Sequence, residues 1–131
     1  MNATEKNKEL VLKALHEAFN LRDNSAYERY WSPDYIQHSA ILPPGVAGLK
    51  KEMSALPPTF KYEPGLIVAE GDHVMVHGKY SGFGAPKAWI IVDIFRIADV
   101  LLVEHWDVIQ DEASEAESKS GVPMFGHVFS N

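Results

Sequence analysis

The sequence predicts an α+β fold, because its helix signals and its strand signals occupy different halves of the chain. Before residue 57, apolar residues recur at helical spacing, whereas runs rich in β-branched and aromatic residues follow one another from residue 60 onward. Short turn sequences separate these runs, which favours an antiparallel meander. The expected architecture is therefore a layer of helices packed on one sheet.

The first half is expected to form three helices and one short extended segment, in the order 3–21 (helix), 26–31 (helix), 35–39 (extended) and 46–56 (helix). Asn2 and Ser25 have side chains that can cap the first two helices. Pro33 is expected to end the second helix and Pro57 the third, because proline cannot continue an α-helix. The second helix is short and unusually aromatic.

The second half is expected to form four strands, over 60–68, 73–80, 88–97 and 101–110. Gly71-Asp72 and the loop at 82–86 have the residues that tight turns favour. The last two strands meet at a turn containing Ala98, Asp99 and Val100. This hairpin is the segment from which the functional hypothesis starts.

Length and composition exclude several classes of protein. A chain of 131 residues is expected to form one domain, 1–131, with its core at about 3–110 and a tail, 111–131, docked on the body or on a partner subunit. The net charge of −6, with scattered basic residues, argues against nucleic acid as a partner. No segment is apolar enough to span a membrane, and no signal peptide is recognisable, so a cytoplasmic location is expected. Cysteine is absent, which excludes thiol chemistry.

Three ionisable residues, Asp93, His105 and Asp107, interrupt the apolar hairpin. If three residues form the turn, Asp93 lies opposite His105 and Ile91 lies opposite Asp107, so all three polar residues share one face. A two-residue turn would shift the register by one and separate Asp93 from His105. The three-residue turn is favoured, and the sequence therefore predicts a cluster of two carboxylates and one imidazole.

Such a cluster in an apolar pocket has the groups that general acid–base catalysis needs. Desolvation and a second carboxylate raise the pKa of a carboxyl group, and a nearby imidazolium opposes them, so a proton donor and a proton acceptor can coexist near neutral pH. The alternative is a structural pair, in which Asp93 and His105 satisfy each other across two strands while Asp107 reaches solvent. The residues alone leave both interpretations open.

Other candidates are weaker. His38 lies on the short extended segment and either points into the same cavity or lies at the surface. Tyr30, Trp31 and Trp89 are expected in the core or in the cavity wall. His105, Asp107 and His38 together would make a set of metal ligands, but no contiguous metal motif is present, so no metal site is expected. Motifs for nucleotide cofactors are absent too, and no cofactor is expected.

The segments Tyr35-Ile36-Gln37-His38, 93–97 (DIFRI) and 103–110 (VEHWDVIQ) resemble the SnoaL-like family of the nuclear transport factor 2-like superfamily. The resemblance implies a cone-shaped α+β barrel, in which three N-terminal helices pack on a strongly bent, mostly antiparallel sheet that encloses an apolar cavity, usually in a homodimer. It implies that Asp107 is the acid/base residue, that Asp93 assists it and that His38 lies near the cavity mouth. Family members typically have glycine at the hairpin turn, where this chain has Val100.

The resulting expectation is a small, cofactor-independent acid/base enzyme of the isomerase, cyclase, dehydratase or hydratase type. It would act on an apolar or aromatic carbonyl compound, with Asp107, His105, Asp93 and His38 as catalytic residues. The pocket is expected to be lined by Phe19, Tyr30, Trp31, Tyr35, Trp89, Ile91, Phe95 and Val103. The alternative is a non-catalytic module of the same fold that binds a small ligand or mediates dimerisation.

Overall fold

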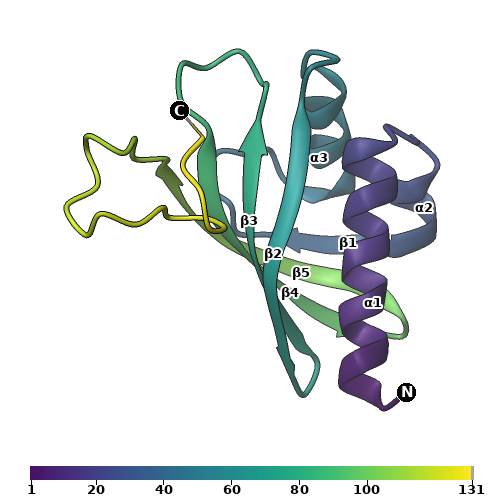
Figure 1. The fold of residues 1–131 in the computed structure, drawn as a ribbon. Helices are drawn as coiled ribbons and strands as arrows, with labels where there is room; N and C mark the ends of the chain where they lie inside the picture. Colours follow the sequence, from purple (N-terminus) through teal and green to yellow (C-terminus); the bar gives the residue numbers. More distant parts are fainter. Residues whose placement is uncertain (131) are drawn as a thin grey trace.

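The computed structural model describes residues 1–130 and confirms the α+β fold, with three α-helices packed on a bent sheet (Figure 1). The elements are α1 (Ala3–Leu15), a π-helical turn (His16–Asn20), α2 (Ala26–Tyr30), β1 (Trp31–Gln37), α3 (Gly45–Ser54), β2 (Lys61–Glu70), β3 (His73–Ser81), β4 (Trp89–Ala98) and β5 (Leu101–Asp111). The sheet has the strand order β1-β5-β4-β3-β2. Strand β1 runs parallel to β5 and the other neighbours are antiparallel, so the sheet is mixed and does not close into a complete barrel.

The segment around Pro33 departs from the expected pattern. The second helix ends one residue early, at Tyr30, and Trp31–Gln37 forms the edge strand β1 instead of a helix end followed by a short extended piece. Proline is tolerated there, because β1 has a neighbour only on the β5 side and an edge strand can spare one N–H donor. The parallel pairing with β5 brings Gln37 opposite His105.

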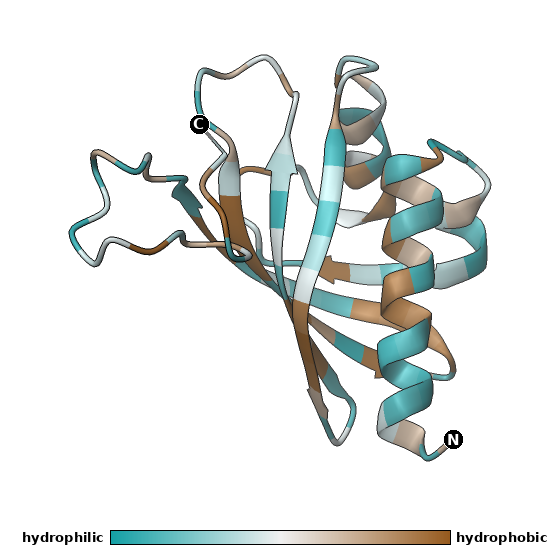
Figure 2. Ribbon diagram, viewed as in Figure 1, coloured by the Kyte–Doolittle hydropathy of each residue, from teal (hydrophilic) through white to brown (hydrophobic). Residues whose placement is uncertain are grey.

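The π-helical turn after α1 joins the helix layer to the sheet. The Asn20 side chain donates from Nδ2 to the backbone oxygen of Tyr62 at 2.8 Å and accepts at Oδ1 from the Tyr62 N–H at 2.9 Å. The Asn20 amide thus forms hydrogen bonds with both backbone groups of Tyr62 on the edge strand β2, as a neighbouring strand would. The preceding residue, Phe19, is only 4% exposed. Figure 2 shows apolar residues on α1 and on the strands of the sheet.

The β4–β5 hairpin has a two-residue turn, so the expected three-residue turn is wrong. Ala98 pairs with Leu101, and Asp99 and Val100 have φ angles of 52° and 61°, a conformation in which a β-branched residue is strained. The register then shifts between Arg96 and Ile97, because Val103 has no partner and forms a bulge. Turn and bulge together contain three residues, so from Glu104 onward the side chains of β5 have the faces that a three-residue turn would give, whereas Leu102 and not Leu101 lies opposite Ile97.

The C-terminal tail packs on the outer side of β2 and β3. The Phe125 ring lies 5.8 Å from the ring of His77, and a Cβ atom on Gly65 would lie 2.7 Å from Phe125 Cε1, so this contact requires glycine at position 65. Met124 Sδ accepts a hydrogen bond from the Ala113 N–H at 3.2 Å. The expected tail, 111–131, therefore contacts the body of the same chain, except that Asn131 lies outside the described residues. None of the helices in 1–130 has the length and hydropathy needed to cross a membrane.

Candidate active site

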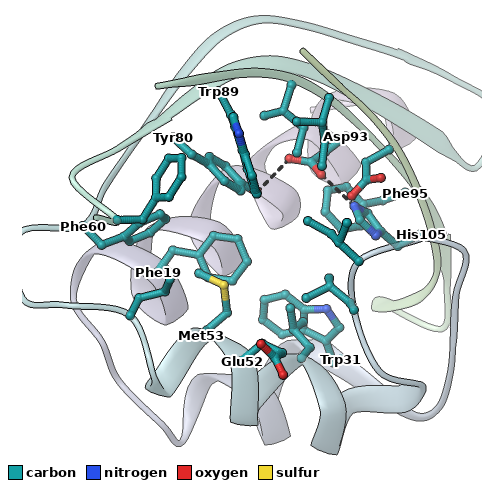
Figure 3. Close-up of a pocket in the computed structure, with 18 of the residues that line it drawn as sticks. Phe19, Trp31, Glu52, Met53, Phe60, Tyr80, Trp89, Asp93, Phe95 and His105 are labelled. Atoms are coloured by element: carbon teal, nitrogen blue, oxygen red, sulfur yellow. Dashed lines mark hydrogen bonds and ion pairs between the residues drawn. The ribbon is translucent and has the colours of Figure 1, made fainter. Parts of the chain in front are cut away.

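An apolar cavity of about 260 Å³ lies between α3 and the inner face of the sheet (Figure 3). Its lining residues are Phe19, Trp31, Tyr35, Ile41, Leu42, Leu49, Glu52, Met53, Leu56, Phe60, Tyr80, Phe83, Trp89, Ile91, Asp93, Phe95, His105, Asp107 and Ile109. Most of these side chains are aliphatic or aromatic. Polar chemistry is therefore confined to a few groups, and the three ionisable residues of the hairpin are among them.

Asp93 and His105 form a buried pair on neighbouring strands. Asp93 Oδ1 lies 2.7 Å from His105 Nε2, and the two residues are 1% and 5% exposed. They are diagonal neighbours, because Asp93 pairs directly with Asp107 and Phe95 pairs with His105. The imidazole lies between two rings, with the Phe95 centroid at 4.8 Å and the Tyr35 centroid at 6.4 Å. The ring of His105 is thus fixed by packing as well as by hydrogen bonds.

Gln37 determines which nitrogen of His105 carries a proton. Its Oε1 atom accepts from the backbone N–H of Ser39 at 3.0 Å, which identifies this atom as oxygen. The same Oε1 lies 2.6 Å from His105 Nδ1, so Nδ1 must be the donor. The contact between Nε2 and Asp93 then holds one proton, on either atom, and the Asp93–His105 pair has no net charge in either case.

Tyr80 satisfies the other oxygen of Asp93. Its hydroxyl group donates to Asp93 Oδ2 at 3.0 Å (Figure 3). Burial, together with the Asp93 carboxylate, raises the pKa of Tyr80 well above its ordinary value, so the phenol keeps its proton and remains a donor. Both oxygens of Asp93 are therefore engaged, and Asp93 has little capacity left to act on a ligand.

Asp107 lies beside this pair in the cavity wall and is only half-buried. Burial raises the pKa of its carboxyl group, the Asp93 charge acts in the same direction, and Ser39 and the charge of His105 oppose them. The net shift is upward. Of the two carboxylates on this face, Asp107 is the one that lines the cavity while remaining accessible, and its raised pKa brings it closer to the range of a general acid or base.

His38 does not point into the cavity, contrary to expectation. Its backbone N–H donates to the backbone oxygen of His105 at 2.9 Å, and its ring stacks on Trp106 at 4.9 Å on the outer face of the sheet. Its Nε2 atom contacts Glu104 Oε2 at 2.7 Å. Side chains alternate along β1, and because Gln37 points inward toward His105, the next residue must point outward. The imidazole expected at the cavity mouth belongs to a surface cluster.

Tyr30 and Val103 are the two predicted pocket residues that do not line the cavity. Tyr30 ends α2, and its hydroxyl group donates to Glu17 Oε2 at 2.6 Å, which directs it toward α1. Val103 is the unpaired bulge residue of β5, so it lies outside the alternation that its neighbours follow. The remaining predicted pocket residues line the cavity: Phe19, Trp31, Tyr35, Trp89, Ile91 and Phe95.

The ligand set weighed for a metal is not assembled, because His38 faces away from His105 and Asp107. Asp93, His105 and Asp107 can each place one ligand atom within 4.8 Å of the others. Both ring nitrogens of His105 are already engaged, however, one by Gln37 and one by Asp93. Coordination through His105 would require breaking one of these bonds, so the donor set fits the hydrogen-bonded cluster better than a metal ion.

Three polar residues of the site were not predicted. Gln37 and Tyr80 are uncharged, and nothing in their local sequence marks them as partners of a buried pair. Glu52 lines the cavity from α3, between the apolar lining residues Leu49 and Leu56. Its position one residue before Met53, on the face that Leu49 and Met53 define, was a usable signal, because residues three and four apart lie on one face of a helix.

The fold and the cavity define a small, cone-shaped domain of the enzyme type, with a carboxylate–imidazole cluster on an apolar wall. The chain belongs to the SnoaL-like family, in the nuclear transport factor 2-like superfamily, because the model of the SnoaL-like domain matches residues 12–105. The comparison with curated proteins found no relative.

Solved structures with this fold include proteins named for different activities. AclR of Streptomyces galilaeus, a proposed hydroxylase, is 28% identical, with a TM-score of 0.67 and coverage of 82% of this chain and 81% of that one. TsrD of Streptomyces laurentii is 21% identical, with a TM-score of 0.68 and coverage of 84% and 91%. A proposed polyketide cyclase from Acidithiobacillus ferrooxidans is 20% identical, with a TM-score of 0.69 and coverage of 84% and 92%. The fold is therefore shared across named activities.

Proposed function

We propose that this protein is a cofactor-independent acid/base enzyme that moves a proton on an apolar or aromatic carbonyl compound held in the cavity. The observation that carries this proposal is the half-buried Asp107 carboxyl group, with its raised pKa, on the wall of an apolar cavity beside a fully hydrogen-bonded Asp93–His105 pair. A raised pKa makes the carboxylate a stronger base, and the same group can then return the proton as an acid.

In the proposed reaction, the Asp107 carboxylate removes a proton from the carbon next to the substrate carbonyl. The C–H electron pair delocalises into the carbonyl group to give an enolate, and Asp107 becomes a carboxylic acid. It then returns the proton to the same carbon, to another carbon or to a leaving hydroxyl group. These outcomes correspond to exchange, isomerisation and dehydration. Alternatively, the enolate carbon attacks a second carbonyl and closes a ring, and the alkoxide that forms takes the proton from Asp107.

Tyr35 is the group best placed to hold the enolate oxygen. Its hydroxyl oxygen accepts a hydrogen bond from Gln37 Nε2 at 3.2 Å, which leaves its own proton to donate to a ligand. Tyr35 lines the cavity, and burial raises its pKa well above the ordinary value, so it keeps that proton at neutral pH. Gln37 would thus orient two cavity groups, His105 and Tyr35. The pair Asp93–His105 would hold the wall beside Asp107 in place.

The second candidate is a module that binds a small ligand without catalysis. It is favoured by one observation, the complete pairing of Asp93, whose two oxygens are engaged by His105 and Tyr80. The cavity of about 260 Å³ that Trp31, Trp89 and Phe95 help to line can hold a ligand in either case. The two candidates differ in whether Asp107 transfers protons.

Exchange of carbon-bound hydrogen in D₂O separates the candidates without knowledge of the natural substrate. Loss of the α-proton signal of 1-tetralone and of cyclohex-2-enone would be followed by NMR with the wild type, Asp107→Asn and Asp111→Asn. Asp111 is an exposed residue of the same strand and serves as the matched control. The wild type and Asp111→Asn should accelerate exchange, and Asp107→Asn should lose about 100-fold or more of this acceleration. Binding of a ketone without accelerated exchange would instead support the binding module.

We further propose that two copies of the chain associate through the outer face of the sheet. Val68, Met75, Ile94 and Trp106 pair laterally across four strands, so they form one apolar row on this face. Val68 is 58% exposed and Met75 is 44% exposed, which is unusual for adjacent apolar residues with no partner. Met75→Glu should shift the protein to a monomer in sedimentation analysis, and an unchanged mass would exclude this interface.

A further inference from the structure

The cavity wall lacks positive charge that could bind an anion. Its lining includes three carboxylates, Glu52, Asp93 and Asp107, and no lysine or arginine. The one imidazole, His105, is engaged with Asp93, and this pair has no net charge. A carboxylate or phosphate on the ligand would therefore meet Asp107 and Glu52 without a compensating cation, which is costly in a partly desolvated site.

The rest of the wall attracts cations. Eight of the nineteen lining residues are phenylalanine, tyrosine or tryptophan, and the faces of such rings carry negative electrostatic potential. Phe83 and Trp89 lie with their ring centroids 4.7 Å apart, and Phe60 and Tyr80 lie 5.6 Å apart. A protonated amine among these rings would gain cation–π attraction in addition to any ion pair.

Glu52 supplies a carboxylate at the opposite side of the cavity from the catalytic cluster. Figure 3 shows it on the helix side, across the pocket from Asp93 and His105. It is exposed, and within residues 1–130 it takes part in no ion pair and no side-chain hydrogen bond. Its neighbours in the lining, Leu49, Met53 and Leu56, are apolar. Glu52 is thus an uncompensated anion facing an aromatic cavity.

We infer that the ligand of this cavity is an amine-bearing ring compound, with its ammonium group at Glu52 and its reacting carbon at Asp107. A cavity of about 260 Å³ whose lining includes eight aromatic rings suits a ring compound. This inference rests on the proposed function only in placing the reacting carbon at Asp107. Glu52 is then a specificity-determining residue that binds the substrate and takes no part in proton transfer.

Three probes with one ring system test the charge preference: 2-naphthylmethylamine, 2-naphthylmethanol and 2-naphthoate. Their dissociation constants would be measured by calorimetry at pH 7 with the wild type, Glu52→Gln and Glu28→Gln. Glu28 is an exposed residue of α2 that does not line the cavity, so its variant has the same change in net charge. The wild type and Glu28→Gln should bind the amine about tenfold more tightly than the alcohol. They should bind the naphthoate about tenfold more weakly than the alcohol.

Glu52→Gln should reduce the preference for the amine to about threefold or less and leave the affinity for the alcohol unchanged. Raising the salt concentration to about 1 M, where the Debye length is about 3 Å, should have a similar effect on the wild type. The inference would be overturned if the wild type bound the amine and the alcohol equally, or if it bound the naphthoate more tightly than the alcohol. It would also be overturned if Glu52→Gln lost affinity for all three probes equally. These are binding measurements, so a failure of α-proton exchange would refute catalysis and leave the ligand class standing.

Discussion

The two faces of the β4–β5 hairpin carry similar residues, but the charged groups are buried on the inner face and partly exposed on the outer face. On the inner face, Asp93 and His105 are 1% and 5% exposed, and their remaining polar atoms bond to the uncharged side chains of Tyr80 and Gln37. On the outer face, Glu104 contacts Arg96 Nε at 2.8 Å and His38 Nε2 at 2.7 Å, and the side chains are partly exposed.

This difference shows that residue type does not locate the site, because both faces combine carboxylate and imidazole. Burial determines the desolvation free energy of each cluster and how strongly its geometry is fixed. A buried pair must be satisfied by neutral donors and acceptors, which fixes its geometry, whereas an exposed ion pair is screened by water and salt. The hydrogen bond from His38 lowers the pKa of Glu104 most, and the hydrogen bond from Arg96 lowers it further. Burial, in contrast, raises the pKa of Asp107.

The largest expected effect comes from breaking the inner pair. Asp93→Ala should lower the free energy of unfolding by about 3–5 kcal/mol, because it leaves the buried His105 and the half-buried Tyr80 without their acceptor. Asp93→Asn should cost only about 1 kcal/mol, since an amide can donate to His105 Nε2 and accept from Tyr80. Urea denaturation measures both. Glu104→Ala on the outer face is the matched control and should change stability much less; equal costs for Ala and Asn at position 93 would contradict the proposed network.

The next effect concerns Gln37, which holds the imidazole from its other side. Gln37→Ala should destabilise the fold by about 1–3 kcal/mol, because His105 Nδ1 and the Ser39 N–H lose their shared acceptor. Nitrogen NMR should show a proton on Nδ1 of His105 in the wild type. Gln110→Ala, at an exposed position of β5, should keep that spectrum. An unchanged Nδ1 signal in Gln37→Ala would show that Gln37 does not hold this proton in place.

A smaller effect is the pH dependence that Asp107 contributes. Its pKa is higher in the folded chain than the ordinary 3.8, so the folded state keeps this proton over a range in which the unfolded chain has lost it. Stability therefore falls as pH rises from about 3.8 through the folded pKa. Asp107→Asn removes this loss, and its stability relative to the wild type should increase across that window and then remain constant. Denaturation at a series of pH values tests this, with Asp111→Asn expected to give a flat difference.

The smallest effect should come from the turn that joins β4 and β5. Val100→Gly removes a β-branched residue from a φ of 61° and should stabilise the protein by about 0.5–1 kcal/mol, after the entropy that glycine adds to the unfolded chain is subtracted. Thermal unfolding measures the gain. Amide spectra of Asp93 and His105 should not change, and a loss of stability would mean that Val100 makes compensating contacts.

The sequence was sufficient for the fold because helix and strand periodicity are local properties. It was insufficient for β1, since the parallel pairing of Trp31–Gln37 with β5 joins residues far apart in the chain. The same pairing decides that Gln37 points inward and His38 outward, which no local pattern determines. Asp93, His105 and Asp107 lie together on the inner face as expected, but the turn and the expected pairs are wrong, because Asp93 lies opposite Asp107, and His105 lies opposite Phe95. The catalytic roles assigned to these residues stay predictions.

The combination of turn and bulge limits how the length of this hairpin can change. Two residues in the turn and one in the bulge make an odd total, and an odd total keeps Asp93, His105 and Asp107 on the inner face. Deleting Val103 alone, or inserting one residue beside Val100, would make the total even and turn one strand's side chains outward. Insertions and deletions should therefore be tolerated here only in pairs, so natural variants of this hairpin should differ in length by even numbers of residues.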